Sequence, residues 1–200
     1  VENGDFSSAG AAHLEIFKVL PQSIATIEGG SFNYGRVMFA ASPQVGAGNL
    51  LYAGEFMHND GPWKKPDNYN KFNGELTYSM GDDANGFSLT ARAYHGVWDS
   101  SDQVAASAVV TGLVPFFGSL DNTTGGNSQR YSLQGEWHRA DNLSATKVMA
   151  YTLYYDMDLF SDFTYFLNNP VQGDQFEQAD RRWTSGIQAR HTLFGQLAES

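Results

Sequence analysis

The sequence is dominated by long runs in which apolar and polar residues alternate. Between Lys71 and Met80, the even-numbered positions hold Phe72, Gly74, Leu76, Tyr78 and Met80, while the odd-numbered positions are polar or charged. A period of two residues places all the apolar side chains on one face of a β-strand, whereas a helix needs a period of 3.6. The pattern therefore predicts long strands with one apolar and one polar face.

Eight segments are candidate strands: 23–30, 36–42, 49–58, 71–80, 87–97, 130–138, 145–155 and 184–193. Most of them are longer than the five or six residues that are common in globular strands. They match the roughly 9–11 residues with which a strand crosses a bilayer. One short helix is expected at 102–112, with Asp102 as its N-cap and Gly112 as its C-cap.

The connections between these segments alternate in length. Those at 43–48, 81–85 and 140–144 are short, and those at 59–70, 99–129 and 156–182 are long. Outer-membrane barrels show this alternation, with short turns at one end and long loops at the other. Aromatic residues near the strand ends suit the girdles of such barrels: Tyr52, Phe56, Tyr78, Phe87, Tyr94, Trp98, Tyr131, Trp137, Tyr151, Tyr154, Tyr155 and Trp183.

We therefore predict an all-β fold, an antiparallel transmembrane β-barrel of which this chain forms a partial barrel of about eight strands. Arg92, Gln134, Glu136, Gln188 and Arg190 would line the lumen. The residues expected to face lipid are Phe72, Leu76, Leu89, Leu133 and Ile187. Two alternatives remain open, a soluble β-sandwich and a small closed barrel of eight strands with a structural role.

Composition excludes several classes of function. Twelve Lys and Arg stand against 22 Asp and Glu, giving a net charge of −10, which argues against nucleic acid as a partner. The absence of Cys excludes disulfides, Cys metal sites and a Cys nucleophile. The most apolar stretch, 109–118, is far short of the ~20 residues of a membrane helix. No signal peptide opens the chain, and we expect it to be a piece of a larger protein.

No motif indicates an enzyme. The sequence has no Gly-x-Ser-x-Gly elbow, no His-Glu-x-x-His helix and no phosphate-binding Gly-rich loop followed by Lys. We predict no catalytic residues, no cofactor and no metal. Asp156, Asp158 and Asp162 lie close together but lack the spacing of a calcium-binding loop, so we interpret them as a solvated acidic loop.

The stretch Glu28-Gly-Gly-Ser-Phe-Asn-Tyr-Gly-Arg36, within 23–36, is similar to the first barrel hairpin of TonB-dependent outer-membrane receptors. The stretches 55–63, 66–69 and 71–74 are similar to the next loop and strand, and 98–104, 117–121 and 125–133 to the loop and strand that follow. The resemblance covers nearly the whole chain.

The resemblance implies a plug domain inside a barrel of about 22 strands. Residues 1–22 would be the tail of the plug, and residues 23–200 the first strands of the barrel. The implied function is uptake of a small-molecule nutrient or chelate, such as a ferric siderophore, across a Gram-negative outer membrane. The implied partners are outer-membrane lipid and TonB, through an N-terminal region that this chain lacks. A carbohydrate-binding module is the alternative for the soluble sandwich.

The candidate ligand contacts are aromatic and basic residues near the expected outer mouth: Trp63, Lys64, Lys65, Tyr69, Trp98, Arg130 and Arg182. Aromatic platforms with a few charges suit a chelate or a sugar. The alternative for each residue is an interfacial anchor or loop packing.

Overall fold

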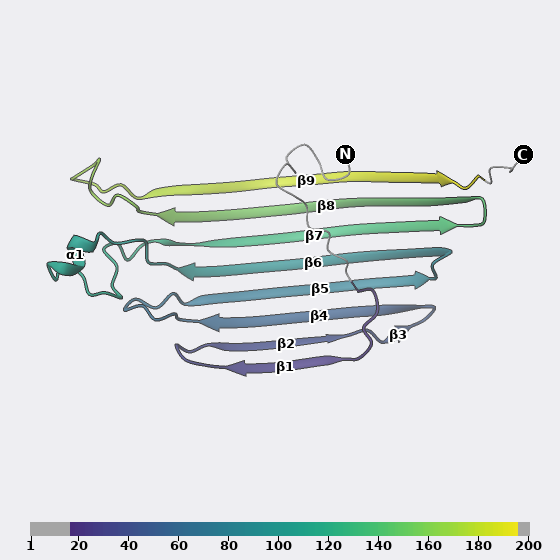
Figure 1. The fold of residues 1–200 in the computed structure, drawn as a ribbon, viewed down its shortest axis with the longest axis horizontal. Helices are drawn as coiled ribbons and strands as arrows, with labels where there is room; N and C mark the ends of the chain where they lie inside the picture. The colour runs from purple at the N-terminus through teal and green to yellow at the C-terminus, as the bar shows by residue number, and fades with distance from the viewer. Residues whose placement is uncertain (1–16, 196–200) are drawn as a thin grey trace, which may run out of the picture.

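The fold, in a computed structural model that describes residues 17–195, is one antiparallel sheet of nine strands (Figure 1). Every long strand pairs with the next long strand along the chain, in the order β1-β2-β4-β5-β6-β7-β8-β9. The bounds are β1 (Ile24–Gly29), β2 (Gly35–Ala41), β3 (Gln44–Val45), β4 (Gly48–Asn59), β5 (Tyr69–Gly81), β6 (Asn85–Asp99), β7 (Gly125–Ala140), β8 (Ser144–Ser161) and β9 (Phe176–Leu193). The predicted all-β fold is confirmed, and each of the eight expected strands is present.

The strands towards the C-terminus are longer than their sequence pattern predicts. Both β8 and β9 have 18 residues, and they incorporate 156–161 and 176–182, which we expected to be loop. Arg181 lies opposite Asp156 in the register and forms an ion pair with it at 3.1 Å. The β8–β9 pairing therefore continues through polar side chains beyond the point where the alternation of apolar and polar residues ends.

Long connections gather at one end of the sheet and short ones at the other, as predicted (Figure 1). In two short turns an Asp carboxylate accepts hydrogen bonds from the backbone. Asp82 accepts from the N–H groups of Ala84 and Asn85, and Asp141 accepts from those of Leu143 and Ser144. Such Asx turns fix the hairpin register at this end.

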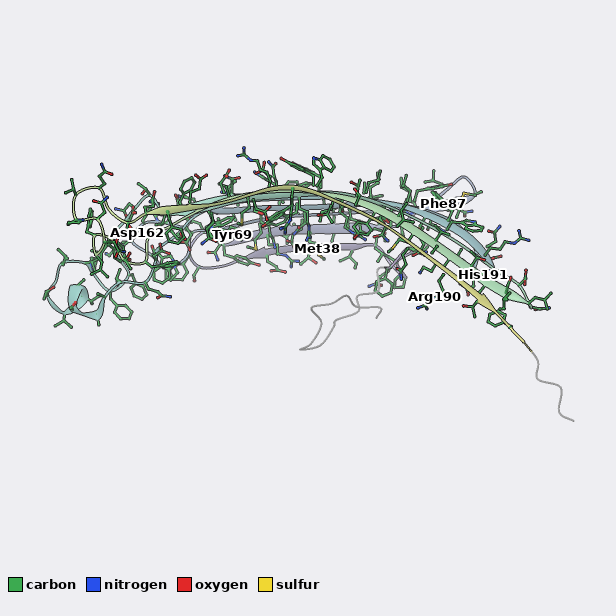
Figure 2. The ribbon with its side chains drawn as sticks, turned by 90° about the horizontal axis from the view of Figure 1, so that it is seen from above. Met38, Tyr69, Phe87, Asp162, Arg190 and His191 are labelled. Carbon is green, nitrogen blue, oxygen red and sulfur yellow. The ribbon has the colours of Figure 1, made fainter. Side chains whose placement is uncertain are left out.

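The pairing register divides the strand residues between two faces, because directly paired residues point to the same side of a sheet. Figure 2 shows the sheet bowed, with Phe87 on the convex side and Met38 and Arg190 on the concave side. The register carries Phe72, Leu76, Leu89, Leu133 and Ile187 onto the convex face. It carries Arg92, Gln134, Glu136, Gln188 and Arg190 onto the concave face. The two sets that we predicted to oppose each other do so.

Burial on the two faces is the reverse of that in a soluble sheet. Convex-face side chains are exposed, Ile187 by 81% and Leu133 by 47%. The fully buried side chains include Thr77, whose hydroxyl donates to Thr90 at 3.0 Å on the concave face. In the part of the chain that the structure describes, only Leu51, Ala108 and Val114 are buried hydrophobic residues. These residues therefore supply almost no apolar core.

The sheet is open, since β9 does not pair with β1. The small closed barrel of eight strands is therefore wrong for this chain. The described residues form a single sheet, so they also lack the second sheet that a β-sandwich requires.

The one helix, α1 (Ala106–Val110), begins later than expected and has no side-chain cap. Asp102 is not its N-cap, because the carboxylate instead accepts the backbone N–H of Asp162 at 2.6 Å. Gly112 follows the C-cap Thr111 with a φ of 75°, the left-handed conformation expected at this position. No helix in residues 17–195 has the length and apolar character to cross a membrane.

The predicted plug tail, residues 1–22, lies mostly outside the described residues. Its last part reaches the concave face, where Lys18 forms an ion pair with Glu136 of β7 at 2.9 Å. The backbone N–H of Leu20 donates to the Ser42 hydroxyl at 2.7 Å. The segment before β1 is thus attached to the concave side of the sheet.

Candidate functional site

A cavity of about 500 Å³ opens where the concave face meets the long loops. We name it the aromatic pocket, and its lining residues are Asn59, Trp63, Asp67, Tyr69, Tyr94, Trp98, Asp99, Ser100 and Ser101. The ends of β4 and β6, the start of β5 and the loops after β4 and β6 supply these residues. Figure 2 shows Tyr69 at the loop end of the sheet.

The strand register explains why three of the rings converge. Tyr69 begins β5, and Tyr94 and Trp98 lie on β6, the neighbouring strand, all on the concave face. Trp63 comes from the loop between β4 and β5 and packs against Phe117 with ring centroids 6.0 Å apart.

Glycines allow the rings to approach the backbone. A Cβ on Gly96 would lie 2.6 Å from the Tyr94 hydroxyl, and one on Gly126 would lie 3.0 Å from the Trp98 ring. Because Gly96 and Gly126 lack side chains, both rings can pack closely over the strands. The Tyr94 and Trp98 rings therefore lie close against the sheet.

The loop that carries Trp63 and Asp67 is closed by hydrogen bonds. The backbone N–H of Asp67 donates to the carbonyl of Asp60, and that of Asp99 donates to the carbonyl of Asp67, both at 2.7 Å. Gly61 has a φ of 67°, and a Cβ there would lie 2.6 Å from a carboxylate oxygen of Asp67. Only glycine suits this position, for both backbone conformation and space.

The two carboxylates of the pocket have different environments. Asp99 receives hydrogen bonds from Lys65 at 3.0 Å and from Asn68 at 2.8 Å. Asp67 hydrogen-bonds to the Trp63 side chain and forms no ion pair with any described residue. Burial raises the pKa of Asp67, and the nearby carboxylates of Asp99 and Asp60 act in the same direction. Keeping the Asp67 carboxylate charged in the folded protein therefore costs folding free energy.

The predicted ligand contacts separate into two groups. Trp63, Tyr69 and Trp98 lie together in the aromatic pocket. The four basic residues lie outside its lining. Lys64 and Lys65 line a neighbouring depression with Val114, Pro115, Gly118, Ser119 and Asn122. Arg130 lies further along the concave face, opposite Tyr94, and Arg182 stacks over Tyr155 with its guanidinium carbon 5.4 Å from the ring centroid.

Six lining residues were not among the predicted contacts: Asn59, Asp67, Tyr94, Asp99, Ser100 and Ser101. Tyr94 could have been found, because it lies four residues before Trp98 and so shares its strand face. Asp67 and Asp99 carry no such signal, because their approach depends on how two loops fold.

The aromatic residues predicted to form girdles divide between the faces. On the convex face, Tyr52, Tyr78, Phe87 and Trp137 lie towards the short turns, and Phe56, Tyr131, Tyr154 and Trp183 towards the long loops. Tyr94, Trp98, Tyr151 and Tyr155 lie on the concave face, so the girdle assignment is wrong for these four.

The acidic residues 156, 158 and 162 do not form a solvated loop. Asp156 and Asp158 belong to β8 and pair with Arg181. Asp162 is only 4% exposed and accepts the backbone N–H of Tyr165. Within residues 17–195, no group of three or more His, Asp or Glu side chains is arranged to hold a metal ion.

Comparisons with family models, with curated proteins and with solved structures found no match to this chain.

Proposed function

We propose that this chain forms part of the wall of an outer-membrane β-barrel, in a receptor of the TonB-dependent type that takes up a small-molecule nutrient. The observation that carries the proposal is the inverted polarity of the sheet. Large apolar side chains cover the convex face without any described element packed over them, while ion pairs occupy the concave face. A lipid bilayer is the solvent that stabilises this arrangement.

The convex face supports the proposal through the position of its charges. Charged side chains of this face lie towards the strand ends, as with the Arg181–Asp156 pair near the long loops and Arg139 near the short turns. Between them lies an apolar band bordered by aromatic rings. On β7, Tyr131 and Trp137 are six residues apart, or roughly 20 Å along a strand. Outer-membrane barrels have a band about 25 Å tall.

The concave face supports a polar lumen. Glu55 lies between Arg36 and Lys71, with N–O distances of 2.7 and 2.6 Å, and Glu75 pairs with Arg92 at 2.7 Å. Paired charges of this kind are compatible with a narrow aqueous interior, and they would be costly against lipid.

The two free edges support a larger barrel. The outer edges of β1 and β9 carry backbone N–H and C=O groups without strand partners in the described residues. Each unsatisfied group costs several kcal/mol inside a membrane. We therefore propose that further strands continue the wall from both edges, and that the aromatic pocket collects the solute at the loop end.

A soluble carbohydrate-binding β-sandwich is the competing function. The rings of the aromatic pocket would suit a sugar, but a sandwich also requires a second sheet over the convex face. No described residue provides that sheet, so we favour the membrane function.

Cell fractionation of the whole gene product tests the proposal. Expressed in a Gram-negative cell, the protein should sediment with outer membranes and resist extraction at alkaline pH. A monomer that folds to the same strand content in buffer without detergent would overturn the membrane assignment.

A further inference from the structure

The aromatic pocket has an acidic lining without a basic residue. Four rings, from Trp63, Tyr69, Tyr94 and Trp98, surround a space that Asp67 and Asp99 also reach. Lys65 is directed to Asp99 and to the carbonyl of Asn122, and it lines the neighbouring depression instead. The pocket therefore offers aromatic rings and carboxylates to a ligand.

The charge balance leaves one carboxylate for a ligand. Lys65 offsets the charge of Asp99 through an ion pair at 3.0 Å, while Asp67 forms no ion pair with any described residue. Burial raises the pKa of Asp67, because the surrounding protein solvates the charged form less well than water does. A ligand cation beside Asp67 would relieve this penalty.

The rings favour a cation for the same electrostatic reason. The face of an aromatic ring carries partial negative charge, and a cation within about 6 Å of its centroid is attracted to it. An anionic chelate, such as a carboxylate-bearing ferric siderophore, would gain nothing from the rings and would be repelled by Asp67. The cavity of about 500 Å³ is within the range of small-ligand sites.

We propose that the aromatic pocket binds a small organic cation of the ammonium class, with its charge enclosed by Trp63, Trp98 and the tyrosines and paired with Asp67. This inference rests on the proposed function and deepens it, since it names the class of solute that the receptor would collect. It replaces the ferric siderophore as the expected solute.

The pocket is largely formed before a ligand arrives. Gly96 and Gly126 allow Tyr94 and Trp98 to pack closely over the strands, and Gly61 holds Trp63 and Asp67 together. Preorganised rings lose little conformational freedom on binding, so the binding free energy is not reduced by a large entropy cost of ordering the site.

Calorimetric titration of the whole gene product in detergent micelles tests the inference. The probe is choline, compared with its neutral isostere 3,3-dimethyl-1-butanol, with glucose and with ferric citrate. Choline should bind at least about tenfold more tightly than the neutral isostere, since the two differ mainly in charge. Trp98→Ala and Asp67→Asn should each weaken choline binding by about tenfold or more.

Matched variants outside the pocket provide the controls. Trp183→Ala removes an exposed indole from the convex face, and Asp83→Asn removes a carboxylate from an exposed short turn. Both should leave choline affinity unchanged, and circular dichroism should show unchanged strand content in all four variants.

Three outcomes would overturn the cation assignment: equal affinity for choline and its neutral isostere, binding of glucose or ferric citrate that Trp98→Ala abolishes, or no choline binding by correctly folded protein. Because the protein in this titration is already folded in detergent, such a result leaves the membrane location as it was. A soluble protein that binds choline would instead contradict the membrane proposal, while the cation-binding assignment of the aromatic pocket would stand.

Discussion

Trp98 lies directly opposite Gly126 in the register of β6 and β7, and its ring covers the position that a Cβ on Gly126 would take, 3.0 Å away. Phe39 and Gly54 form the same relationship on the convex face. Tyr151 and Gly186 form it on the concave face, between β8 and β9. An aromatic ring over a cross-strand glycine fills the space that the missing side chain leaves, which helps to fix the register.

We expect Gly126→Ala to destabilise the protein by about 1–3 kcal/mol, the usual cost of overpacking. The added Cβ would lie 3.0 Å from the ring and also 2.6 Å from the backbone carbonyl oxygen of Asp158, which cannot rotate away. Gly186→Ala is the matched control, because the three atoms nearest to its added Cβ all belong to the outer end of the Tyr151 ring and none is backbone. Denaturant unfolding in micelles measures both, and a larger loss for Gly186→Ala would contradict this account.

Arginine substitution should distinguish the two faces of β7. In lipid vesicles, Leu133→Arg should cost about 2–4 kcal/mol of unfolding free energy, since its convex-face position would place the charge against lipid. Gln134→Arg, one residue further on the concave face, should cost less than about 1 kcal/mol. Equal costs at the two positions would contradict the assignment of lipid to the convex face and water to the concave face.

Glu55 joins three concave-face side chains, and its removal should loosen the start of the sheet. Its carboxylate receives hydrogen bonds from Arg36 and from Asn73 and pairs with Lys71. Glu55→Gln should lower the unfolding free energy by about 1–3 kcal/mol, because it removes the ion-pair partner of Lys71 and leaves Arg36 paired with Glu28 alone. In a double-mutant cycle, Arg36→Gln should cost less in the Glu55→Gln background than alone. Additive costs would show that the pair contributes nothing.

The Asp67 carboxylate should make stability depend on pH in an unusual direction. Because burial raises its pKa, the folded state binds this proton more tightly than the unfolded state. The charge therefore costs stability as the pH rises from the unfolded-state pKa to the raised folded-state pKa; the cost is complete above the folded-state pKa and absent in acid below both. Asp67→Asn should raise the denaturation midpoint at pH 7 and leave it unchanged at pH 3.

The groups that face Asp67 are Trp63, Asp60, Asp99 and Lys65, and none of them is altered in this variant. Asp83→Asn provides the control for charge removal in an exposed turn. If Asp67→Asn lowers the midpoint at pH 7, then the carboxylate stabilises the loop and is not held for a ligand.

Alternation of residue types was enough to predict the strands and the two faces, because a period of two leaves a β-sheet no other way to separate Leu133 from Gln134. It was not enough where the ladder continues through polar pairs such as Arg181 and Asp156. Asp102 looked like a helix N-cap, but the local sequence could not reveal the more distant backbone N–H of Asp162 that it accepts.

The candidate site was predictable in its aromatic part and not in its charges. Tyr69 and Trp98 could be placed near each other because both lie at the loop ends of neighbouring strands. Lys64 and Lys65 are predicted beside them as loop charges near the outer mouth, yet in the structure they line a depression with Val114 and Asn122. The consequence is an acidic pocket where the sequence suggested a mixed one.

The central claim is that the convex face contacts lipid, and spin labels along β7 test it most directly. These 200 residues contain no Cys, so a cysteine introduced at one position from 131 to 137 is unique within them. Any cysteine elsewhere in the whole gene product is first replaced by serine, and the labelled protein is then placed in vesicles. Labels at 131, 133, 135 and 137 should be relaxed by oxygen, which concentrates in lipid, and those at 132, 134 and 136 by a water-soluble nickel complex. Odd-numbered labels that respond to the nickel complex, or to neither reagent, would contradict the account.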